Sequence, residues 1–322
     1  MTFDHKNIPL INLKFKKIKK NVLVVGGGRW ANIILNELIL NFKNIKTIFI
    51  ITKNKNIIKK LPTEIVKKIS IQSNLNNINL KQITHAIIVN KNSDHFLTAK
   101  KIIKHKINIL VEKPLVYKIK EYEILKKLSY KKRKLIHVST PFFFAYYFFY
   151  IKKLINTDNA ELTFEWHDPK NDRRHGILKK YDKSLNYLED TVYHIYGILN
   201  CLFGKKKITY VSSKNFKDHG NLIFRYGEVK INLNCSRNQN KKRIRKIRIN
   251  SINKIIKVNY SDDEKVILTL NRKKKNIIFN FCQKTLKYQL FNFLNTKKYS
   301  KNYCLNDIRN FDNLFYLIKN IR

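Results

Sequence analysis

The chain has 322 residues, of which 43% are hydrophobic and 12% aromatic, so it can bury sizeable cores and is not expected to be disordered. Its length exceeds the size at which a single core keeps growing, and two domains are expected. The formal net charge of +45 suggests nucleic acid or a membrane surface as a partner. Because the lysines are spread over every segment and accompany an excess of Asn and Ile, we expect a compositional bias and neither of these partners.

Neither a secreted nor a membrane-spanning protein is expected. The first 20 residues lack the continuous apolar core of a signal peptide, and the most apolar stretch, 141–151, is too short to cross a bilayer. The cysteines lack metal-ligand spacing, which indicates reduced thiols in a cytoplasmic protein and no bound metal. These cysteines are Cys201, Cys235, Cys282 and Cys304.

The first half of the chain alternates apolar strands with helical periods, the pattern of βαβ units on a parallel sheet. Strands are predicted at 22–25, 47–51, 69–72, 85–89, 107–111 and 135–139. Helices are predicted at 31–40, 57–68, 94–104 and 119–128. Together they form a predicted Rossmann-type domain over residues 20–140.

The second half, residues 141–322, predicts an α+β domain with a large, mostly antiparallel open sheet. Strands are predicted at 160–166, 208–213, 221–225, 228–234, 243–250, 254–260, 265–270 and 276–281. Helices are predicted at 145–155, 187–203, 285–294 and 305–321. The basic run 241–248 alternates with apolar residues near its end, which favours a solvated sheet face over a phosphate-binding groove.

A glycine turn of G-x-G-x-x-A form follows the first strand directly. Gly26 would permit a tight turn, Gly28 a close approach of the backbone to a pyrophosphate, and Ala31 close packing of the next helix. N–H groups at the start of that helix would meet the phosphate charge. The strand before the turn and the helix after it favour dinucleotide binding over a merely structural turn. The predicted cofactor-binding residues here are Gly26, Gly28, Arg29 and Trp30.

Thr52 and Lys53 end the second strand, where NAD-binding domains usually place an acidic residue that holds the ribose hydroxyls. A hydroxyl and an ammonium suit a 2′-phosphate better than a bare ribose, and Arg29 adds a second cation. NADP is therefore preferred over NAD as the expected cofactor. The alternative is that Lys53 is one more lysine in a lysine-rich chain.

Glu112-Lys113-Pro114 ends the apolar run 107–111. Ligands of open α/β sheets bind outside the carboxyl ends of the strands, so a lysine held there can face a bound ligand. The alternative is a surface lysine before a turn.

The segments VLVVGGGRWA, IIVNKNSDH (87–95) and ILVEKPL (109–115) resemble the glucose–fructose oxidoreductase/inositol dehydrogenase (Gfo/Idh/MocA) family. The resemblance is dense over residues 21–116 and thinner afterwards. It implies an NAD(P)-dependent dehydrogenase or reductase.

The same resemblance implies roles for two loops. In the family, the loop after the strand at 85–89 lies against the nicotinamide side of the cofactor, which makes Asn90, Asn92 and His95 cofactor-binding candidates. Lys91 stands where the family usually has proline, which leaves the rigidity of this loop open. Glu112 and Lys113 would lie at the cofactor, with Lys113 hydrogen-bonded to the reacting oxygen and Glu112 orienting neighbouring groups.

Asp190 and His194 lie four residues apart in the predicted helix 187–203, so they share one helix face. The family's catalytic pair has this D-x-x-x-H spacing, and the resemblance implies that His194 is the acid–base and that Asp190 positions it. Histidine suits this role because its ordinary pKa lies near neutrality. Such pairs are common by chance, and the glycines that family members often carry ahead of the aspartate are replaced here by 185–189.

Polar and aromatic residues gather ahead of this helix, at 166–169, 173–176 and 181–182. They predict either a substrate pocket whose arginines, Arg173 and Arg174, bind an anionic group, or an exposed loop with incidental charges. The sequence by itself leaves both open.

The sequence thus predicts an α/β oxidoreductase that transfers a hydride between nicotinamide and a carbonyl, alcohol or imine carbon of a small polar substrate. Lys113 would polarise the oxygen, His194 exchange the proton and Asp190 hold the imidazole. The exposed face of the C-terminal sheet offers a surface for homo-oligomerisation. The alternatives are a non-catalytic nucleotide-binding family member acting as a regulator or partner protein, and a basic nucleic-acid-binding protein.

Overall fold

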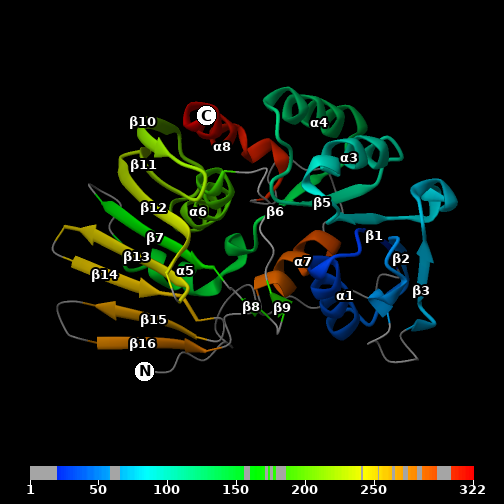
Figure 1. The fold of residues 1–322 in the computed structure, drawn as a ribbon, viewed down its shortest axis with the longest axis horizontal. Coiled ribbons are helices and arrows are strands. Elements are labelled where there is room, and N and C mark those ends of the chain that lie inside the picture. Colours follow the sequence, from blue (N-terminus) through cyan, green and yellow to red (C-terminus); the bar gives the residue numbers. More distant parts are fainter. Residues whose placement is uncertain are drawn as a thin grey trace. The chain divides into compact units, whose positions relative to one another are not determined.

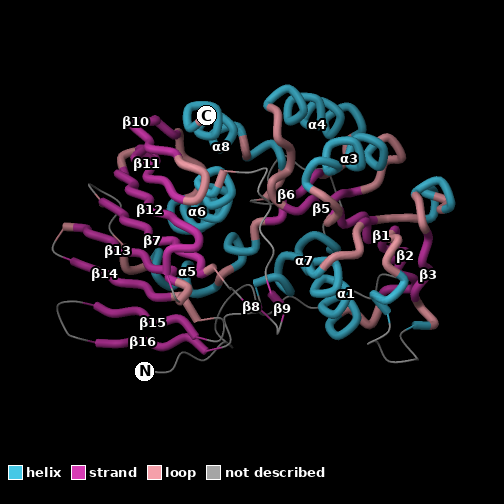
Figure 2. The backbone as a smooth tube through the Cα atoms, viewed as in Figure 1, coloured by secondary structure: helices cyan, strands magenta, loops and turns pink. Residues whose placement is uncertain are grey.

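In the computed structural model the chain forms two compact units (Figures 1 and 2). The described part of the N-terminal unit lies within Lys14–Thr140 and Leu286–Asn310, and that of the C-terminal unit lies within Pro141–Thr285 and Phe311–Arg322. The structure describes residues 20–58, 66–155, 160–170, 173–174, 177–178, 186–240, 242–252, 254–262, 265–270, 275–280, 285–295 and 306–322. Within these residues, no helix is long and apolar enough to cross a membrane.

A six-stranded parallel sheet forms the centre of the N-terminal unit, with the strand order β3-β2-β1-β4-β5-β6. The strands are β1 (Lys20–Val25), β2 (Ile45–Ile51), β3 (Ile69–Gln72), β4 (His85–Ile88), β5 (Asn108–Glu112) and β6 (Ile136–Ser139). This confirms the predicted Rossmann-type sheet. β1 pairs with β2 on one side and with β4 on the other, so the strand order reverses at β1. Such a reversal marks the ligand-binding edge of an open α/β sheet.

The N-terminal unit also holds helices and short 3-10 turns, most of them between these strands and two, α7 and η8, from late in the chain (Figure 2). The helices are α1 (Arg29–Asn41), α3 (His95–Ile103), α4 (Ile119–Lys132) and α7 (Thr285–Asn295), and the 3-10 turns are η2 (Lys55–Ile58), η3 (Leu75–Asn77), η4 (Leu80–Gln82), η5 (Asn92–Asp94) and η8 (Ile308–Asn310). α1 buries Ala31, Ile34, Leu35 and Leu38, the spacing of one apolar helix face. The helix predicted at 57–68 lies largely outside the described residues.

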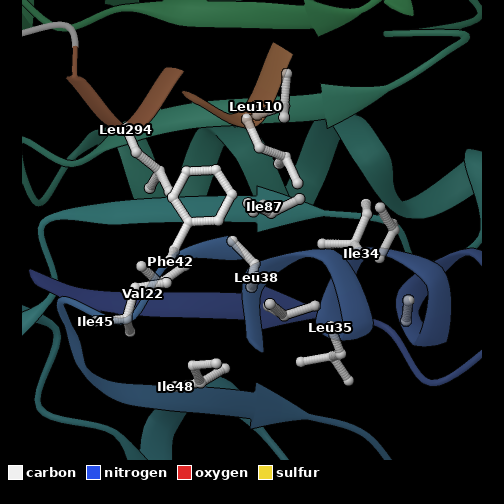
Figure 3. Close-up of a cluster of buried hydrophobic side chains, with 14 of the residues drawn as sticks. Val22, Ile34, Leu35, Leu38, Phe42, Ile45, Ile48, Ile87, Leu110 and Leu294 are labelled. Carbon is white, nitrogen blue, oxygen red and sulfur yellow. The ribbon is translucent and has the colours of Figure 1, made fainter. Parts of the chain in front are cut away.

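Helix α7 packs with the N-terminal unit although the sequence-based division assigns all of 141–322 to the second domain. Its apolar side chains join the cluster built by β1, α1 and β2. Figure 3 shows Leu294 reaching the same cluster as Phe42 and Val22. The difference arises because the boundary was drawn along the chain, whereas burial of the apolar face of α7 brings a distant segment back to the first sheet.

The chain after α7 also returns to edge strand β6. Val138 N donates to Asn306 O at 2.8 Å, the Asn306 amide donates to Val138 O at 3.2 Å, and His137 forms an isolated bridge with Asp307. These bonds occupy part of the edge of the sheet. The single helix predicted at 305–321 is therefore wrong: Asp307 bridges to β6, η8 follows, and α8 (Asp312–Ile321) begins only after Phe311.

Two buried histidines flank α7. The rings of His85 and His137 contact Phe293 edge-on, with centroids at 5.1 and 5.3 Å. Burial lowers the pKa of His137 to about 4 and that of His85 well below its usual value, because a charged imidazole is poorly solvated in an apolar core. Both rings are therefore neutral at pH 7.

The eight-stranded sheet of the C-terminal unit has the order β10-β11-β12-β7-β13-β14-β15-β16. Its strands are β7 (Glu161–Pro169), β10 (Ile208–Asn215), β11 (His219–Tyr226), β12 (Val229–Asn240), β13 (Ile244–Ser251), β14 (Lys254–Asn259), β15 (Lys265–Leu270) and β16 (Lys275–Asn280). A two-stranded sheet pairs β8 (Arg173–Arg174) with β9 (Ile177–Leu178). All neighbours in the large sheet are antiparallel except β12 and β7, which confirms the predicted mostly antiparallel sheet.

Helix α6 (Tyr187–Phe203) is buried along nearly its whole length and packs with η6 (Pro141–Phe144), α5 (Tyr146–Lys152) and α8. The aromatic run 141–151 is a buried element, as predicted, with Phe143, Tyr147 and Phe148 enclosed. Its aromatic side chains cover one face of α6, and inward-facing strand residues contact the same helix. This enclosure fixes the face on which Asp190 and His194 lie.

The expectation of a solvated face over 241–248 holds for Lys246 and Arg248, which are exposed, but is wrong for Arg245, which is buried. The buried residues Ile247 and Ile249 set the inward register of β13, and two residues earlier that register falls on Arg245. A guanidinium therefore enters the interior of the C-terminal unit.

Acidification is expected to destabilise the N-terminal unit. The unfolded chain protonates near the ordinary histidine value of 6.5, whereas folded His137 protonates near 4. The contribution of neutral His137 to the free energy of unfolding is therefore fully present above about pH 6.5. It is lost as the pH drops toward 4, and the loss amounts to roughly 3 kcal/mol for a pKa shift of this size. Urea unfolding at pH 7.5 and 5 should show a smaller acid loss for His137→Leu than for the parent. The control is His105→Leu, at an exposed position, and it should lose as much unfolding free energy on acidification as the parent does. Equal acid losses in the parent and both variants would contradict the prediction.

Candidate active site

The glycine corner after β1 has a backbone that only glycine adopts without strain. Gly26 has φ +141°, and a Cβ at this position would lie 2.6 Å from the carbonyl oxygen of Val89. Its N–H donates to Ile51 O at 3.0 Å. The corner therefore packs between Ile51, at the end of β2, and Val89, which follows β4. This is the point at which the strand order reverses.

Gly28 is the N-cap of α1, and it differs from Gly26 because a Cβ there would meet nothing within 4 Å. Helix α1 begins at Arg29 with no side-chain cap and no acidic residue in its first turn. The first N–H groups of a helix lack intrahelical acceptors and attract anions. The open space beside Gly28 and the uncapped helix start fit a dinucleotide pyrophosphate.

The residues after β2 brace the glycine corner. Thr52 is 9% exposed, its hydroxyl accepts from Asn54 N at 2.9 Å, and a Cβ on Gly27 would collide with it. The Asn54 amide donates to Gly27 O at 3.1 Å. Lys53, between Thr52 and Asn54, is exposed to solvent beside the glycine corner. Thr52 instead packs against Gly27.

Asn54 was not singled out by the sequence analysis. A Thr-x-Asn segment directly after a strand could have indicated it, because such side chains hydrogen-bond the backbone two residues onward and form tight turns. Asn54 accepts from Asn56 N at 3.1 Å in this way.

His95 supports the loop that follows β4. The ring is 0% exposed, and its Nδ1 donates to Pro114 O at 2.8 Å. Burial lowers the pKa of His95 despite this hydrogen bond, so the neutral ring links the loop to the segment after β5. Asn90, half-buried, donates to Thr98 Oγ1 at 3.0 Å, and Asn92 is the first residue of η5.

The Glu-Lys-Pro segment is tied to the glycine corner by a side-chain hydrogen bond. The Trp30 indole N–H donates to Glu112 Oε2 at 2.7 Å, which joins the first turn of α1 to the end of β5. Lys113 follows, half-buried. Glu112 thus orients Trp30, a neighbour in the predicted cofactor site.

In the C-terminal unit, Asp190 and His194 are half-buried on α6. The Asn186 side chain accepts from Leu188 N and caps the helix, which ends at Gly204. The His194 ring stacks on Trp166 of β7, with centroids 5.0 Å apart and planes 14° apart. Phe142 meets the same imidazole edge-on at 5.5 Å.

A buried ion pair lies beside this stack. Arg245 forms a short salt bridge with Asp168, and these residues are only 4% and 1% exposed. The Arg245 guanidinium lies over the Trp166 ring, 3.9 Å from its centroid. Sequence reasoning had included Trp166 and Asp168 in a mixed cluster but missed Arg245; extending the register of Ile247 and Ile249 backwards would have found it.

Part of the polar and aromatic cluster predicted ahead of α6 lies within the described residues. Asp168 is engaged by Arg245 inside the protein and is not part of an exposed loop. Arg173 and Arg174 form β8, and residues 175–176 and 181–182 lie outside the described residues. The predicted anion-binding role of the two arginines stays a prediction.

Residues 20–140 match the family described as "Oxidoreductase family, NAD-binding Rossmann fold" (Gfo/Idh/MocA). This match covers the N-terminal Rossmann-type domain. This confirms the resemblance seen in the sequence and the expectation of an NAD-binding oxidoreductase. A search of curated protein sequences gave no match.

Solved structures share the fold over nearly the whole chain. A dehydrogenase (MviM) from Clostridium difficile is 15% identical with a TM-score of 0.71, covering 94% of this chain and 98% of its own. UDP-N-acetylglucosamine 3-dehydrogenase GnnA from Acidithiobacillus ferrooxidans is 14% identical with a TM-score of 0.70, covering 95% and 97%. GenD2 from gentamicin A biosynthesis, solved with NAD, is 13% identical with a TM-score of 0.71, covering 94% of each chain.

Gly26 and Gly28, in the glycine corner after β1, are expected to respond oppositely to substitution. Gly28→Val should leave the unfolding midpoint within about 2 °C, because its Cβ enters open space, yet weaken dinucleotide binding about ten-fold or more by filling that space. Gly26→Ala should lower the midpoint by roughly 5 °C or more. Thermal unfolding and fluorescence titration with NADPH and NADH check both. Unchanged affinity in Gly28→Val would contradict the placement of the pyrophosphate.

Proposed function

We propose that this chain catalyses reversible hydride transfer between the nicotinamide of NADP or NAD and a carbonyl, alcohol or imine carbon of a small polar substrate. Two observations together carry the proposal. A Cβ on Gly28 would meet nothing within 4 Å, so the glycine corner has open space beside it. The hydrogen bond from Trp30 to Glu112 joins this corner to the end of β5, where Lys113 follows directly. The family match over residues 20–140 supports it.

The proposed division of labour follows from the chemistry of each side chain. The nicotinamide supplies or accepts the hydride when the dinucleotide is bound. Lys113 donates a hydrogen bond to the reacting oxygen and stabilises its developing negative charge. His194 exchanges the proton of that oxygen with solvent, and Asp190, one helical turn earlier, orients the imidazole.

Lys113→Ala is expected to lower kcat about 100-fold or more, the usual effect of removing one donor to a developing oxyanion, while the Kd for NADPH changes by less than about 3-fold. NADPH formation or loss would be followed by absorbance over a panel of sugars, polyols and amino sugars. The matched control is Lys120→Ala, an exposed lysine on α4, which should keep parental rates. Turnover that survives both Lys113→Ala and His194→Asn would favour the non-catalytic regulator instead.

We further propose that NADP is preferred over NAD. Lys53 is exposed at the carboxyl end of β2, where an acidic residue usually holds the ribose, and Arg29 begins α1. Two cations around this corner suit a 2′-phosphate, which Arg and Lys bind through charge-assisted hydrogen bonds. Thr52 contributes by packing against Gly27.

Lys53→Asp is expected to weaken NADPH binding about ten-fold or more through loss of one charge-assisted hydrogen bond, and to strengthen NADH binding, because the new carboxylate can accept from the ribose hydroxyl. Fluorescence titration of each variant with both dinucleotides measures the ratio. The control is Lys46→Asp, the same charge change at an exposed position near the start of β2, which should keep the parental ratio. An NADPH preference unchanged in Lys53→Asp would refute the assignment.

Two further features belong to the same proposal. A homo-oligomer formed through the solvent-facing side of the eight-stranded sheet would follow the usual symmetry of soluble enzymes, and sedimentation measures its mass. A cytoplasmic location is supported by Cys201 and Cys235, which are buried free thiols, as expected in a reducing compartment.

A further inference from the structure

Trp166 has two ring-face neighbours that the proposed reaction does not by itself explain. The His194 imidazole stacks on it with a plane angle of 14°, and the Arg245 guanidinium lies 3.9 Å from its ring centroid. Cross-strand pairing of Trp166 with Arg245 in the β7–β13 register fixes this second contact. An indole is thereby placed in contact with both a candidate acid–base group and a buried cation.

The guanidinium is itself immobilised. Its Nη1 donates to His167 O and Ile244 O, both at 2.8 Å, and its Nη2 pairs with Asp168. The backbone N–H of Arg245 donates to Ser261 Oγ at 2.9 Å. Because the pair is buried and Nη1 and Nη2 are both hydrogen-bonded, the guanidinium cannot move without breaking a charge-assisted network.

Aromatic rings complete the surroundings. Phe142 is edge-on to both His194 and Trp166, at 5.5 and 5.8 Å, and Tyr260 is edge-on to Trp166 at 6.1 Å. Stacked and edge-on aromatic pairs each favour one relative orientation. The imidazole plane of His194 is therefore set by rings as well as by its own helix.

We propose that Trp166, backed by the Asp168–Arg245 pair, is a positioning residue for His194: it holds the imidazole plane so that a ring nitrogen stays directed at the substrate through the catalytic cycle. The inference rests on the acid–base role given to His194 above. The indole face also attracts the imidazolium that forms when His194 takes up a proton, so the stack strengthens in the protonated state.

Several ionisable groups lie on the elements that carry or adjoin this stack. Cys235 of β12 and Arg245 of β13 are the strand partners of Trp166, and Tyr260 after β14 contacts its ring. Asp168 of β7 pairs with Arg245. Tyr187 of α6 lies near that pair, Arg237 of β12 lies over the Tyr187 ring, and Asp190 precedes His194 by four residues on α6. Burial raises the pKa values of Tyr187, Cys235 and Tyr260, so these stay neutral between pH 5 and 9. Asp168 and Arg245 pair with each other, and His194 is the ionisable group stacked on Trp166 that the test below removes.

The first test uses Trp166 as a reporter. The chain has two tryptophans, so Trp30→Phe leaves Trp166 alone, and an imidazolium stacked on an indole quenches its emission. Emission should fall in one step as the pH is lowered from 9 to 5, and the step should vanish in Trp30→Phe/His194→Asn. The matched control is Trp30→Phe/His167→Asn: His167 adjoins Trp166 in sequence but bonds Ser236 Oγ at 2.7 Å, and its removal should keep the step. A step that is absent, or that survives His194→Asn, overturns the proposal.

The second test separates positioning from mere packing. Trp166→Leu should lower kcat about 10- to 100-fold, as a misdirected catalytic group does, with KM within about 3-fold, and should shift the acid limb of the pH–rate profile. Trp166→Phe, which restores a stacking ring, should recover most of the rate and the parental profile. Parental kcat in Trp166→Leu, or a loss confined to KM, overturns the proposal.

The two tests also distinguish this inference from the proposed function. If His194→Asn keeps full turnover while the His194-dependent emission step is present, the stack exists but His194 is not the acid–base, and the positioning role falls with it. If His194→Asn abolishes turnover while Trp166 emission ignores pH, the acid–base role stands and the positioning role is wrong.

Discussion

The close approach of Gly26 to Val89 is the constraint on which the N-terminal site depends. With φ +141° and no room for a Cβ, the chain leaves β1 in a direction that no other residue adopts without strain. That direction starts α1 with uncapped N–H groups and brings Trp30 within hydrogen-bonding distance of Glu112. The corner proposed to bind the pyrophosphate and the Glu-Lys-Pro segment are thus joined through this backbone conformation.

The C-terminal unit reaches its local order differently. Its polar centre is a buried ion pair, Asp168–Arg245, whose desolvation is offset by the salt bridge and by two hydrogen bonds from Nη1 to backbone carbonyls. Removing either partner would leave an uncompensated charge among aromatic rings. A network of this kind specifies one arrangement of β7 and β13, and with it the orientation of the indole on which His194 stacks.

The His85–Phe293–His137 arrangement shows that burial also decides which segments belong together. Helix α7 follows the last strand of the C-terminal sheet in sequence, yet its apolar face completes the core of the first sheet. Residues 306–307 then cover the edge strand β6. The N-terminal unit is therefore closed by residues that lie far along the chain from its other strands.

The sequence by itself determined the elements whose signals are local: six apolar runs for the parallel strands, the glycine turn, the Glu-Lys-Pro segment and the four-residue spacing of Asp190 and His194. Each depends on residues close together in the chain, where periodicity and backbone preference act. The tertiary structure decided what depends on partners far apart: the return of α7, the break before α8 and the role of His95 as a support. These follow from burial and hydrogen bonding between distant segments, which no local pattern encodes. Arg245 and Asn54 do have local signals, in the register of β13 and in a Thr-x-Asn segment, but their partners Asp168 and Gly27 come from other segments of the chain.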